Sequence, residues 1–374
     1  MVIWDQVIGH DQPIEALRRA LARDRAAAGY LFRGPEGVGK RLVARGLAQA
    51  LRCTAADGER PCGACEECRS VADGWQQEVI VCQPTLTGGS GAARSWLYRM
   101  EYIEQLLEQV ALRGATGRWR TVIIDGAEFL GERPSTLLLK TLEEPPARTA
   151  FILLAARTAI ILPTIVSRLQ LLDFGLVPAE MIIDWLQTVH GQGAQQARLA
   201  AALAAGRPGR ALEWCTSEGL QVLRGELLEQ VRGLGRLPAA AALAEALWLT
   251  PPPTTARRGA ADDGLAADDE DEDPTEAVAR ADRVSWGLDL LEWWYRDALV
   301  LAAGGATAQL VQPELATELG VVAAQLGAAG CRDALGALAE ARIALARQGN
   351  AQLVSEVLFL RLARGRRRLG SPTA

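Results

Sequence analysis

The segment Gly34-Pro35-Glu36-Gly37-Val38-Gly39-Lys40-Arg41 decides the fold class of this chain. It follows a short apolar run, residues 30–32, and leads into a helical pattern at residues 41–51. A G-x-x-x-x-G-K sequence between a strand and a helix is typical of phosphate-binding loops. Its glycines let the backbone N–H groups face phosphate oxygens, the helix N-terminus adds a favourable dipole, and Lys40 offers a charge to the β and γ phosphates. The alternative is an ordinary glycine-rich turn between a strand and a helix.

The loop departs from the usual nucleotide-binding pattern in the residue after the lysine. A Ser or Thr is expected there as a Mg²⁺ ligand, but Arg41 has donors only. Asp125 ends the apolar strand at residues 122–124, where its carboxylate can hold Mg²⁺ through water. The next residue is Gly126, although hydrolytic enzymes of this type carry a glutamate there as general base. Glu128, two residues further on, is expected to point elsewhere. The sequence therefore predicts that ATP binding is possible, that Mg²⁺ binding is doubtful, and that hydrolysis is impaired.

Strand and helix patterns alternate in the first 175 residues. Continuous β-branched runs at 79–81, 122–124 and 151–154 suit buried strands of a parallel sheet, and helical patterns lie between them at 12–23, 101–112 and 134–142. This alternation predicts an α/β domain built on an open parallel sheet.

The rest of the chain has a helical pattern. Three short helices are expected at 178–188, 194–205 and 208–215, followed by longer Leu- and Ala-rich helices at 277–303, 313–328, 334–347 and 351–364. We therefore predict an α/β domain at 1–175, a small three-helix lid domain at 176–215 and a helical collar domain at 216–374. Prolines and acidic residues at about 251–275 predict a disordered insertion, with a specific acidic docking segment as the alternative.

Composition excludes several classes of protein. Hydrophobic residues make up 49% of the 374 residues, so each domain can bury a core. No apolar run reaches the length of roughly 18–20 residues needed to span a bilayer, and the N-terminus lacks a secretory signal pattern, which favours a cytoplasmic protein. The net charge of −5 gives no argument for direct DNA binding. The arginines at 364 and 366–368 are more simply explained by a favourable helix dipole than by DNA contact.

Four cysteines have the spacing of a metal site. Cys53, Cys62, Cys65 and Cys68 form C-x8-C-x2-C-x2-C. Four thiolates at such spacing can surround one zinc ion tetrahedrally, with no open position for catalysis. A disulfide pair is the alternative, and it is disfavoured in a cytosolic chain.

A phosphate loop followed closely by this cysteine module resembles the bacterial clamp-loader family of AAA+ proteins, whose members include the tau/gamma and delta prime subunits of DNA polymerase III. Other segments carry the same resemblance: residues 4–10, 138–146, 162–168, 206–212 and 350–362. It implies an adenine-side contact at Val7 and Ile8 and a lid-helix sensor at Arg210, for which a solvated helix arginine is the alternative.

Within that family the departures favour the delta prime type. Arg41, Gly126 and the Ala156-Arg157 pair at the sensor position each remove a group used in hydrolysis. The resemblance implies a stator with little ATPase activity of its own, a non-catalytic member of the polymerase (nucleotidyltransferase) holoenzyme. It also implies that Arg168 acts as a trans arginine finger on a neighbouring subunit's ATP; a surface or helix-capping arginine is the alternative.

The implied partners are tau/gamma-type and delta-type subunits in a hetero-oligomer, the sliding clamp, and primed DNA reached mostly through the complex, with no membrane. Two other functions remain open at this stage: an active tau/gamma-like ATPase, and a zinc-stabilised AAA+ scaffold outside replication.

Overall fold

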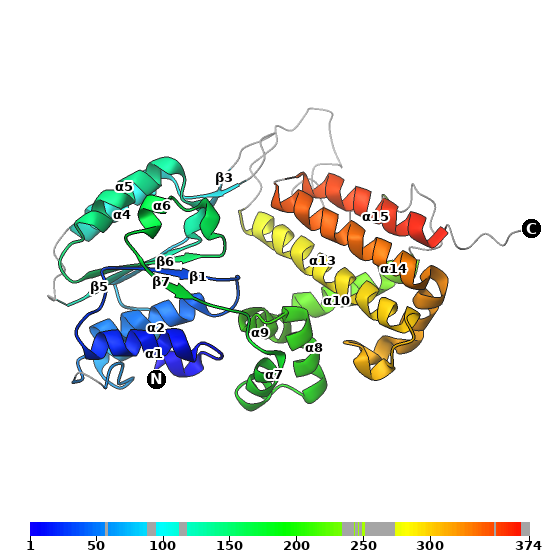
Figure 1. Ribbon diagram of the computed structural model, residues 1–374, viewed down its shortest axis with the longest axis horizontal. Helices are drawn as coiled ribbons and strands as arrows, with labels where there is room; N and C mark the ends of the chain where they lie inside the picture. The colour runs from blue at the N-terminus through cyan, green and yellow to red at the C-terminus, as the bar shows by residue number, and fades with distance from the viewer. Residues whose placement is uncertain are drawn as a thin grey trace, which may run out of the picture. The chain divides into compact units, whose positions relative to one another are not determined.

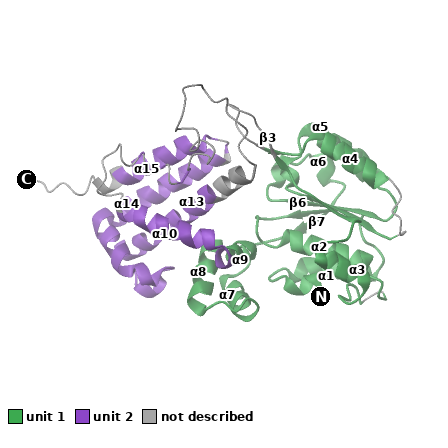
Figure 2. Ribbon diagram, turned by 180° about the vertical axis from the view of Figure 1, so that it is seen from behind, with its two compact units in different colours: residues 1–87, 96–213 green, residues 88–95, 214–374 purple. Residues whose placement is uncertain are grey.

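The computed structural model describes residues 1–56, 59–87, 95–111, 118–233, 243, 246, 249–250, 274–347 and 349–367. The chain divides into two compact units, shown in Figure 2. One comprises residues 1–87 and 96–213, and the other residues 88–95 and 214–374. The division falls close to the predicted start of the collar domain, while the predicted lid helices fall within the first unit. The three-domain division stays a prediction.

A five-stranded sheet forms the centre of the first unit. Its strand order is β2-β5-β6-β1-β7, and every strand pairing in it is parallel. The strands are β1 (Gly29–Arg33), β2 (Val79–Cys82), β5 (Arg120–Asp125), β6 (Thr149–Ala155) and β7 (Gln170–Asp173). All seven residues of β6 are buried, because helices cover both faces of the sheet. The predicted α/β class with a parallel sheet is confirmed.

Two layers of helices enclose this sheet. Helices α1 (Asp11–Ala22) and α2 (Lys40–Arg52) cover one face, and α4 (Met100–Ala111) and α5 (Glu132–Glu143) cover the other (Figure 1). Each face has its own apolar core, the first around Leu47 and Ile152 and the second around Ile103 and Phe151. The short elements are η1 (Ile3–Gln6), α3 (Glu66–Asp73), η2 (Ala127–Phe129), η3 (Thr158–Ile160) and α6 (Pro163–Val166).

Three strands escaped the sequence analysis. β7 is an edge strand of only four residues, and β3 (Thr85–Thr87) and β4 (Ser95–Leu97) pair as a two-stranded sheet. Such short runs contain too few apolar residues to show the alternation of apolar and polar positions that is typical of a strand. The first unit ends with α7 (Ala179–Thr188), α8 (Ala194–Ala204) and the greater part of α9 (Pro208–Thr216), close to the three predicted short helices.

The second unit is helical. Its longer helices are α10 (Glu218–Gly233), α13 (Pro274–Ala302), α14 (Ala316–Ala346) and α15 (Ala351–Arg367), joined by the short turns η4 (Thr307–Gln309) and η5 (Pro313–Leu315). Two helices were predicted at 313–328 and 334–347, and α14 consists of two helical segments that meet at a kink at Gly327 (φ 60°, ψ 178°). The second segment begins earlier than predicted, because residues 329–333 are also helical.

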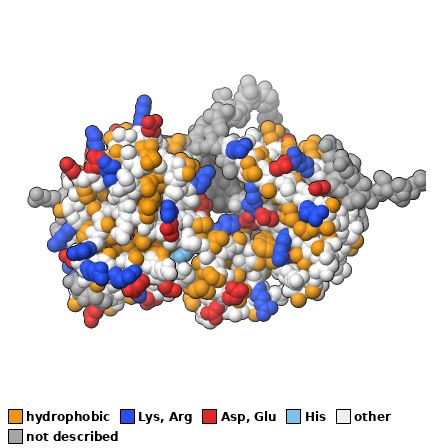
Figure 3. All heavy atoms as spheres, in the orientation of Figure 1, with side chains coloured by type: hydrophobic (Ala, Val, Ile, Leu, Met, Phe, Trp, Pro, Cys, Tyr) orange, Lys and Arg blue, Asp and Glu red, His pale blue; other side chains and the backbone are white. Residues whose placement is uncertain are grey.

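The predicted acidic insertion lies outside the described residues, except that α13 already begins at Pro274. Within the described residues, none of the helices combines the length and apolarity required to cross a lipid bilayer. On the face drawn in Figure 3, acidic side chains lie next to the basic ones on both units, in keeping with the small net charge.

Candidate functional site

The predicted phosphate loop joins β1 to α2 as expected. Its first glycine, Gly34, donates its N–H to the carbonyl of Ala155 at 3.1 Å, which ties the loop to the end of β6. Gly37 has φ 75°, in the left-handed region that favours glycine, and Gly39 is the N-cap of α2 with φ 110°. The loop therefore has the backbone freedom that a phosphate cradle needs, at the N-terminus of a helix.

Lys40 is engaged by the loop itself. Its Nζ donates to the carbonyl oxygens of Gly34 and Pro35, at 2.6 Å each. Burial lowers the pKa of Lys40, while the nearby carboxylates of Glu36, Asp125 and Glu128 act in the opposite direction. The lysine that would contact a nucleotide's phosphates is thus held by backbone acceptors and faces three carboxylates.

Arg41, in the first turn of α2, and Asp125, at the end of β5, form an ion pair. Arg41 Nε donates to Asp125 Oδ2 at 2.6 Å, and its Nη2 contacts the same oxygen. Asp125 ends β5, as predicted. The carboxylate that would hold Mg²⁺ through water is therefore bound by a guanidinium. Arg41 offers no metal ligand of its own, and it also pairs with Asp125, the other candidate ligand for Mg²⁺.

The expectation that Glu128 points elsewhere is wrong. The turn η2 brings this side chain back to the end of β6, where its Oε1 accepts the N–H of Ala156 at 3.0 Å. Ala156 is the residue at the sensor position. The sequence did contain a signal for this position: Glu128 lies three residues after Asp125, which ends a strand, so a tight turn can bring it back to the sheet.

The third of the predicted lid helices contacts the phosphate loop directly. Gly209, near the start of α9, donates its N–H to the carbonyl of Gly37 at 2.8 Å. A β-carbon on Gly37 would lie 3.2 Å from Arg210 Cγ, so the stem of the predicted sensor arginine packs on the loop. The structure thus brings Arg210 together with the P-loop.

The N-terminal segment reaches the same loop through a residue outside the predicted set. Val7 and Ile8 are half-buried, and Val7 packs against the core of the α2 face. The link to the loop is His10, a buried side chain whose Nε2 donates to the carbonyl of Val38 at 2.7 Å. Burial lowers the pKa of His10, so the ring is neutral at physiological pH.

Arg168 lies away from this pocket, between α6 and β7. Its Nη1 donates to the carbonyl of Thr164 at 2.8 Å, and its Nη2 donates to Glu143 Oε1 at 2.6 Å. The contact with Thr164 is the helix-capping arrangement left open as the alternative. The side chain is nevertheless 35% exposed, so it is accessible from outside the unit. Its partner Glu143 is the last residue of α5. The sequence did not reveal that this glutamate pairs with Arg168.

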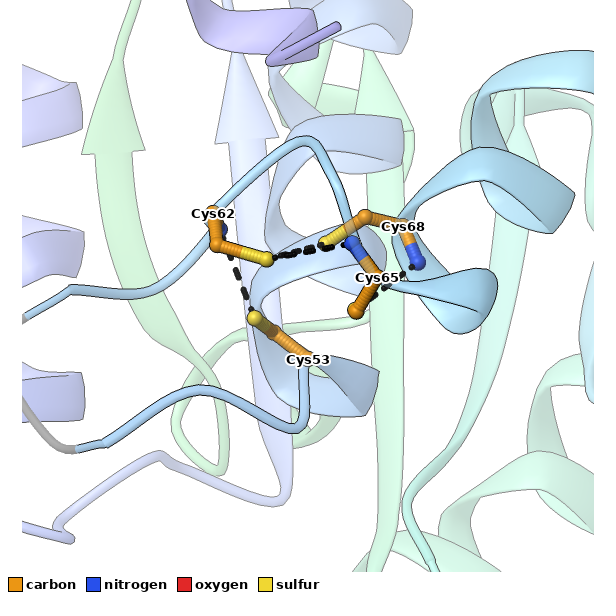
Figure 4. A group of neighbouring side chains, drawn as sticks. All are labelled: Cys53, Cys62, Cys65 and Cys68. Atoms are coloured by element: carbon orange, nitrogen blue, oxygen red, sulfur yellow. Dashed lines mark hydrogen bonds between the residues drawn. The ribbon is translucent and has the colours of Figure 1, made fainter.

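The four cysteines converge on one point, as Figure 4 shows. Their sulfur atoms all lie within 4.8 Å of one another, and Cys62 Sγ is 4.0 Å from Cys68 Sγ. All four are free thiols. Four sulfurs each about 2.3 Å from a zinc ion are spaced in this way, so the donor set fits one tetrahedral zinc.

Backbone amides point at these sulfurs. Cys62 N and Ala55 N donate to Cys53 Sγ at 3.3 and 3.4 Å, and Cys65 N donates to Cys62 Sγ at 3.4 Å. The backbone N–H groups of Cys65 and Ala64 lower the pKa of Cys62, which favours the thiolate that a metal needs. Burial acts in the opposite direction on Cys53 and Cys68, whose pKa values are raised.

The cysteine module is fastened to the helix that carries the phosphate loop. Cys53 is the C-cap of α2. The buried side chain of Gln49 on that helix accepts from Ile3 N at 2.9 Å and donates to Met1 O and to Cys68 O, each at 2.9 Å. Buried Arg52 pairs with Glu67 at 2.8 Å, inside the module. One helix thus has the phosphate loop at its start and the cysteine cluster at its end.

Residues 9–177 match the protein family described as "DNA polymerase III, delta subunit". Among curated proteins, the chain is similar to DNA polymerase III subunit tau of Salmonella typhimurium, with 32% identity over 183 residues, covering 49% of this chain and 27% of that protein. It is also similar to subunit tau of Bacillus subtilis, with 29% identity, 50% of this chain and 31% of that protein covered. The chain thus spans less than a third of the length of these two relatives.

Among solved structures, a gamma-subunit-related protein of Thermotoga maritima matches with a TM-score of 0.46 and 15% identity, covering 95% of this chain and 100% of that one. The B. subtilis clamp loader delta protein matches with a TM-score of 0.33 and 14% identity, covering 94% of this chain and 99% of that one.

Proposed function

We propose that this chain, whose residues 9–177 match the family described as "DNA polymerase III, delta subunit", is an AAA+ clamp-loader subunit of bacterial DNA polymerase III and acts as the delta prime-type stator of the loader. In that role it assembles with tau/gamma-type and delta-type subunits and helps ATP-driven loading of the sliding clamp onto primed DNA. It contributes structure and one arginine, without consuming ATP itself.

The ion pair between Arg41 and Asp125 carries this proposal. Hydrolysis in P-loop proteins needs a divalent cation next to the β and γ phosphates. Here a guanidinium is bound to the carboxylate that would hold that cation. Gly126 also offers no carboxylate to activate water, and the loss of a general base costs about 10²–10⁴-fold in rate. Both observations support a pocket that stabilises the subunit without turning over.

Arg168 is the group we propose to act on the neighbour. A guanidinium has the planar fork that suits the developing charge on a γ-phosphate. Its 35% exposure leaves it accessible, and its contacts with Thr164 and Glu143 hold its direction at the surface. We further propose that the four cysteines hold one structural zinc, which would brace the end of α2.

The first test is nucleotide turnover by the purified chain. We expect no ATPase activity above background, with or without Mg²⁺, and no change on Lys40→Ala. A coupled phosphate-release assay measures both. Clear turnover that the Lys40→Ala substitution abolishes would instead support an active motor of the tau/gamma type.

A second test concerns the residue that holds Arg168. Glu143→Gln removes the charge that fixes the Arg168 guanidinium, while keeping the size of the side chain. We expect a reduction of about 2–10-fold in DNA-stimulated ATPase of the reconstituted complex, because a mispositioned finger loses part of its contribution. The substitution should have no further effect once Arg168 is alanine. Additive losses would show that Glu143 acts independently of Arg168.

A further inference from the structure

Glu128 and Lys40 both contact the backbone where the phosphate loop meets the end of β6. Its Oε1 accepts the N–H of Ala156 at 3.0 Å. The preceding residue, Ala155, accepts the N–H of Gly34 at 3.1 Å, and Lys40 Nζ donates to the carbonyl of Gly34 at 2.6 Å. This chain of contacts places the Glu128 carboxylate and the Lys40 ammonium around the same short stretch of backbone.

The second carboxylate oxygen of Glu128 is unusual. The residue is only 7% exposed, and its Oε2 is buried and accepts no hydrogen bond from the part of the chain that the structure describes. A buried carboxylate oxygen without a donor is costly, and one that persists at a ligand-binding loop calls for a functional explanation. Asp125, by contrast, is already paired with Arg41.

We infer that Glu128 makes this phosphate loop reject nucleoside triphosphates, by holding a negative charge beside Lys40, where the β and γ phosphates of a nucleotide would lie. The inference rests on the proposed stator function and goes beyond it by naming the residue that decides the ligand. Like charges at close range in a partly buried site oppose each other strongly. A divalent cation would screen them, but Arg41 occupies the carboxylate that would hold it.

The test is nucleotide affinity, measured by fluorescence anisotropy with fluorescent ATP and ADP analogues on the full chain in EDTA. We expect Glu128→Gln and Glu128→Ala to bind the ATP analogue at least about 10-fold tighter than the unaltered chain, because a like charge is removed from the pocket. The gain should be smaller for the ADP analogue, which lacks the γ-phosphate. Glu132→Gln is the matched control, since Glu132 is an exposed carboxylate four residues further on, and it should leave both affinities unchanged.

Two variants guard against misfolding, because glutamine would bury an amide donor whereas alanine buries none. The nucleotide affinity of a variant is interpreted only if the variant shows a cooperative thermal unfolding transition, which indicates that it is folded. Affinities of folded variants that equal those of the unaltered chain, or fall below them, would overturn the inference, even if the chain hydrolyses no ATP. Turnover by the unaltered chain would overturn the stator function instead, so the two failures are distinguishable.

Discussion

Replacing Arg168 with alanine in the reconstituted complex should sharply reduce DNA-stimulated ATP hydrolysis while leaving assembly intact. Trans-acting arginines contribute about 10³–10⁵-fold in rate in related phosphoryl-transfer systems. The ATP site of the neighbouring subunit should therefore contribute almost no hydrolysis. The total ATPase activity of the complex should fall to the level that its other ATP sites support. Single-turnover hydrolysis and a clamp-loading assay measure the two consequences. The chain should still fold, because Arg168 is exposed and its side chain bonds only to Thr164, Ser167 and Glu143 in the described structure.

Two further substitutions make this result specific. Arg168→Lys keeps the charge but loses the planar fork, so it should restore little activity if the finger works by two-point contact. Arg133→Ala removes an exposed arginine from the start of α5 and should leave hydrolysis unchanged. Normal hydrolysis by the Arg168→Ala complex would mean that Arg168 is only the cap of α6.

The architecture of the first unit was predictable because its central buried strands are continuously apolar. Residues 122–124 and 151–154 identified β5 and β6, and the G-x-x-x-x-G-K segment identified the loop between β1 and α2. The edge strand β7 could not be found in this way, since a strand of four residues with one buried position has no distinctive pattern. In the second unit, Ala- and Leu-rich sequence predicted a break between two helices within residues 313–347 but placed it a few residues late, since the kink lies at Gly327.

The site was predictable as a set of residues but not as a set of contacts. Motif spacing placed Lys40 and Asp125 at the loop and the cysteines at one point, and the family resemblance implied that Arg210 acts there too. It could not show that Arg41 pairs with Asp125, because the two are 84 positions apart and the pairing depends on how β5 lies beside α2. Glu128 was misjudged for a related reason: the turn η2 reverses the chain, so distance along the sequence is a poor guide to direction.

Removal of the proposed zinc should have the largest effect on stability. We expect about one zinc per chain by elemental analysis of protein purified without chelator, and none in a Cys62→Ser variant. Loss of a bound structural metal is among the changes that destabilise by more than about 3 kcal/mol. At about 2–4 °C per kcal/mol for a unit of this size, the melting temperature should fall by at least about 6–12 °C.

Cys215→Ser is the matched control for this experiment. Cys215 is a half-buried free thiol on α9, outside the cluster, so its replacement should leave the zinc content unchanged. An intact cluster that contains no zinc, or a melting temperature unaffected by chelation, would contradict the proposal. Two thiols lost to a disulfide would appear in a free-thiol count under denaturing, non-reducing conditions.

The loss of stability on zinc removal should begin in the N-terminal segment and the cysteine module. Gln49 joins Met1 and Ile3 to the carbonyl of Cys68, and Met1's own ammonium donates to Gly63 O at 2.7 Å, so the N-terminal segment is held by the cysteine module. Chelation should therefore increase hydrogen exchange first in residues 1–6 and 53–73, and only later in β5 and β6. The phosphate loop lies at the opposite end of α2, and its contacts with Ala155 and Gly209 do not pass through the cysteines. Exchange at Gly37 and Gly39 that rises together with the N-terminal segment would show that α2 transmits the loss along its length; exchange that stays low would show that the zinc stabilises one end of the unit only.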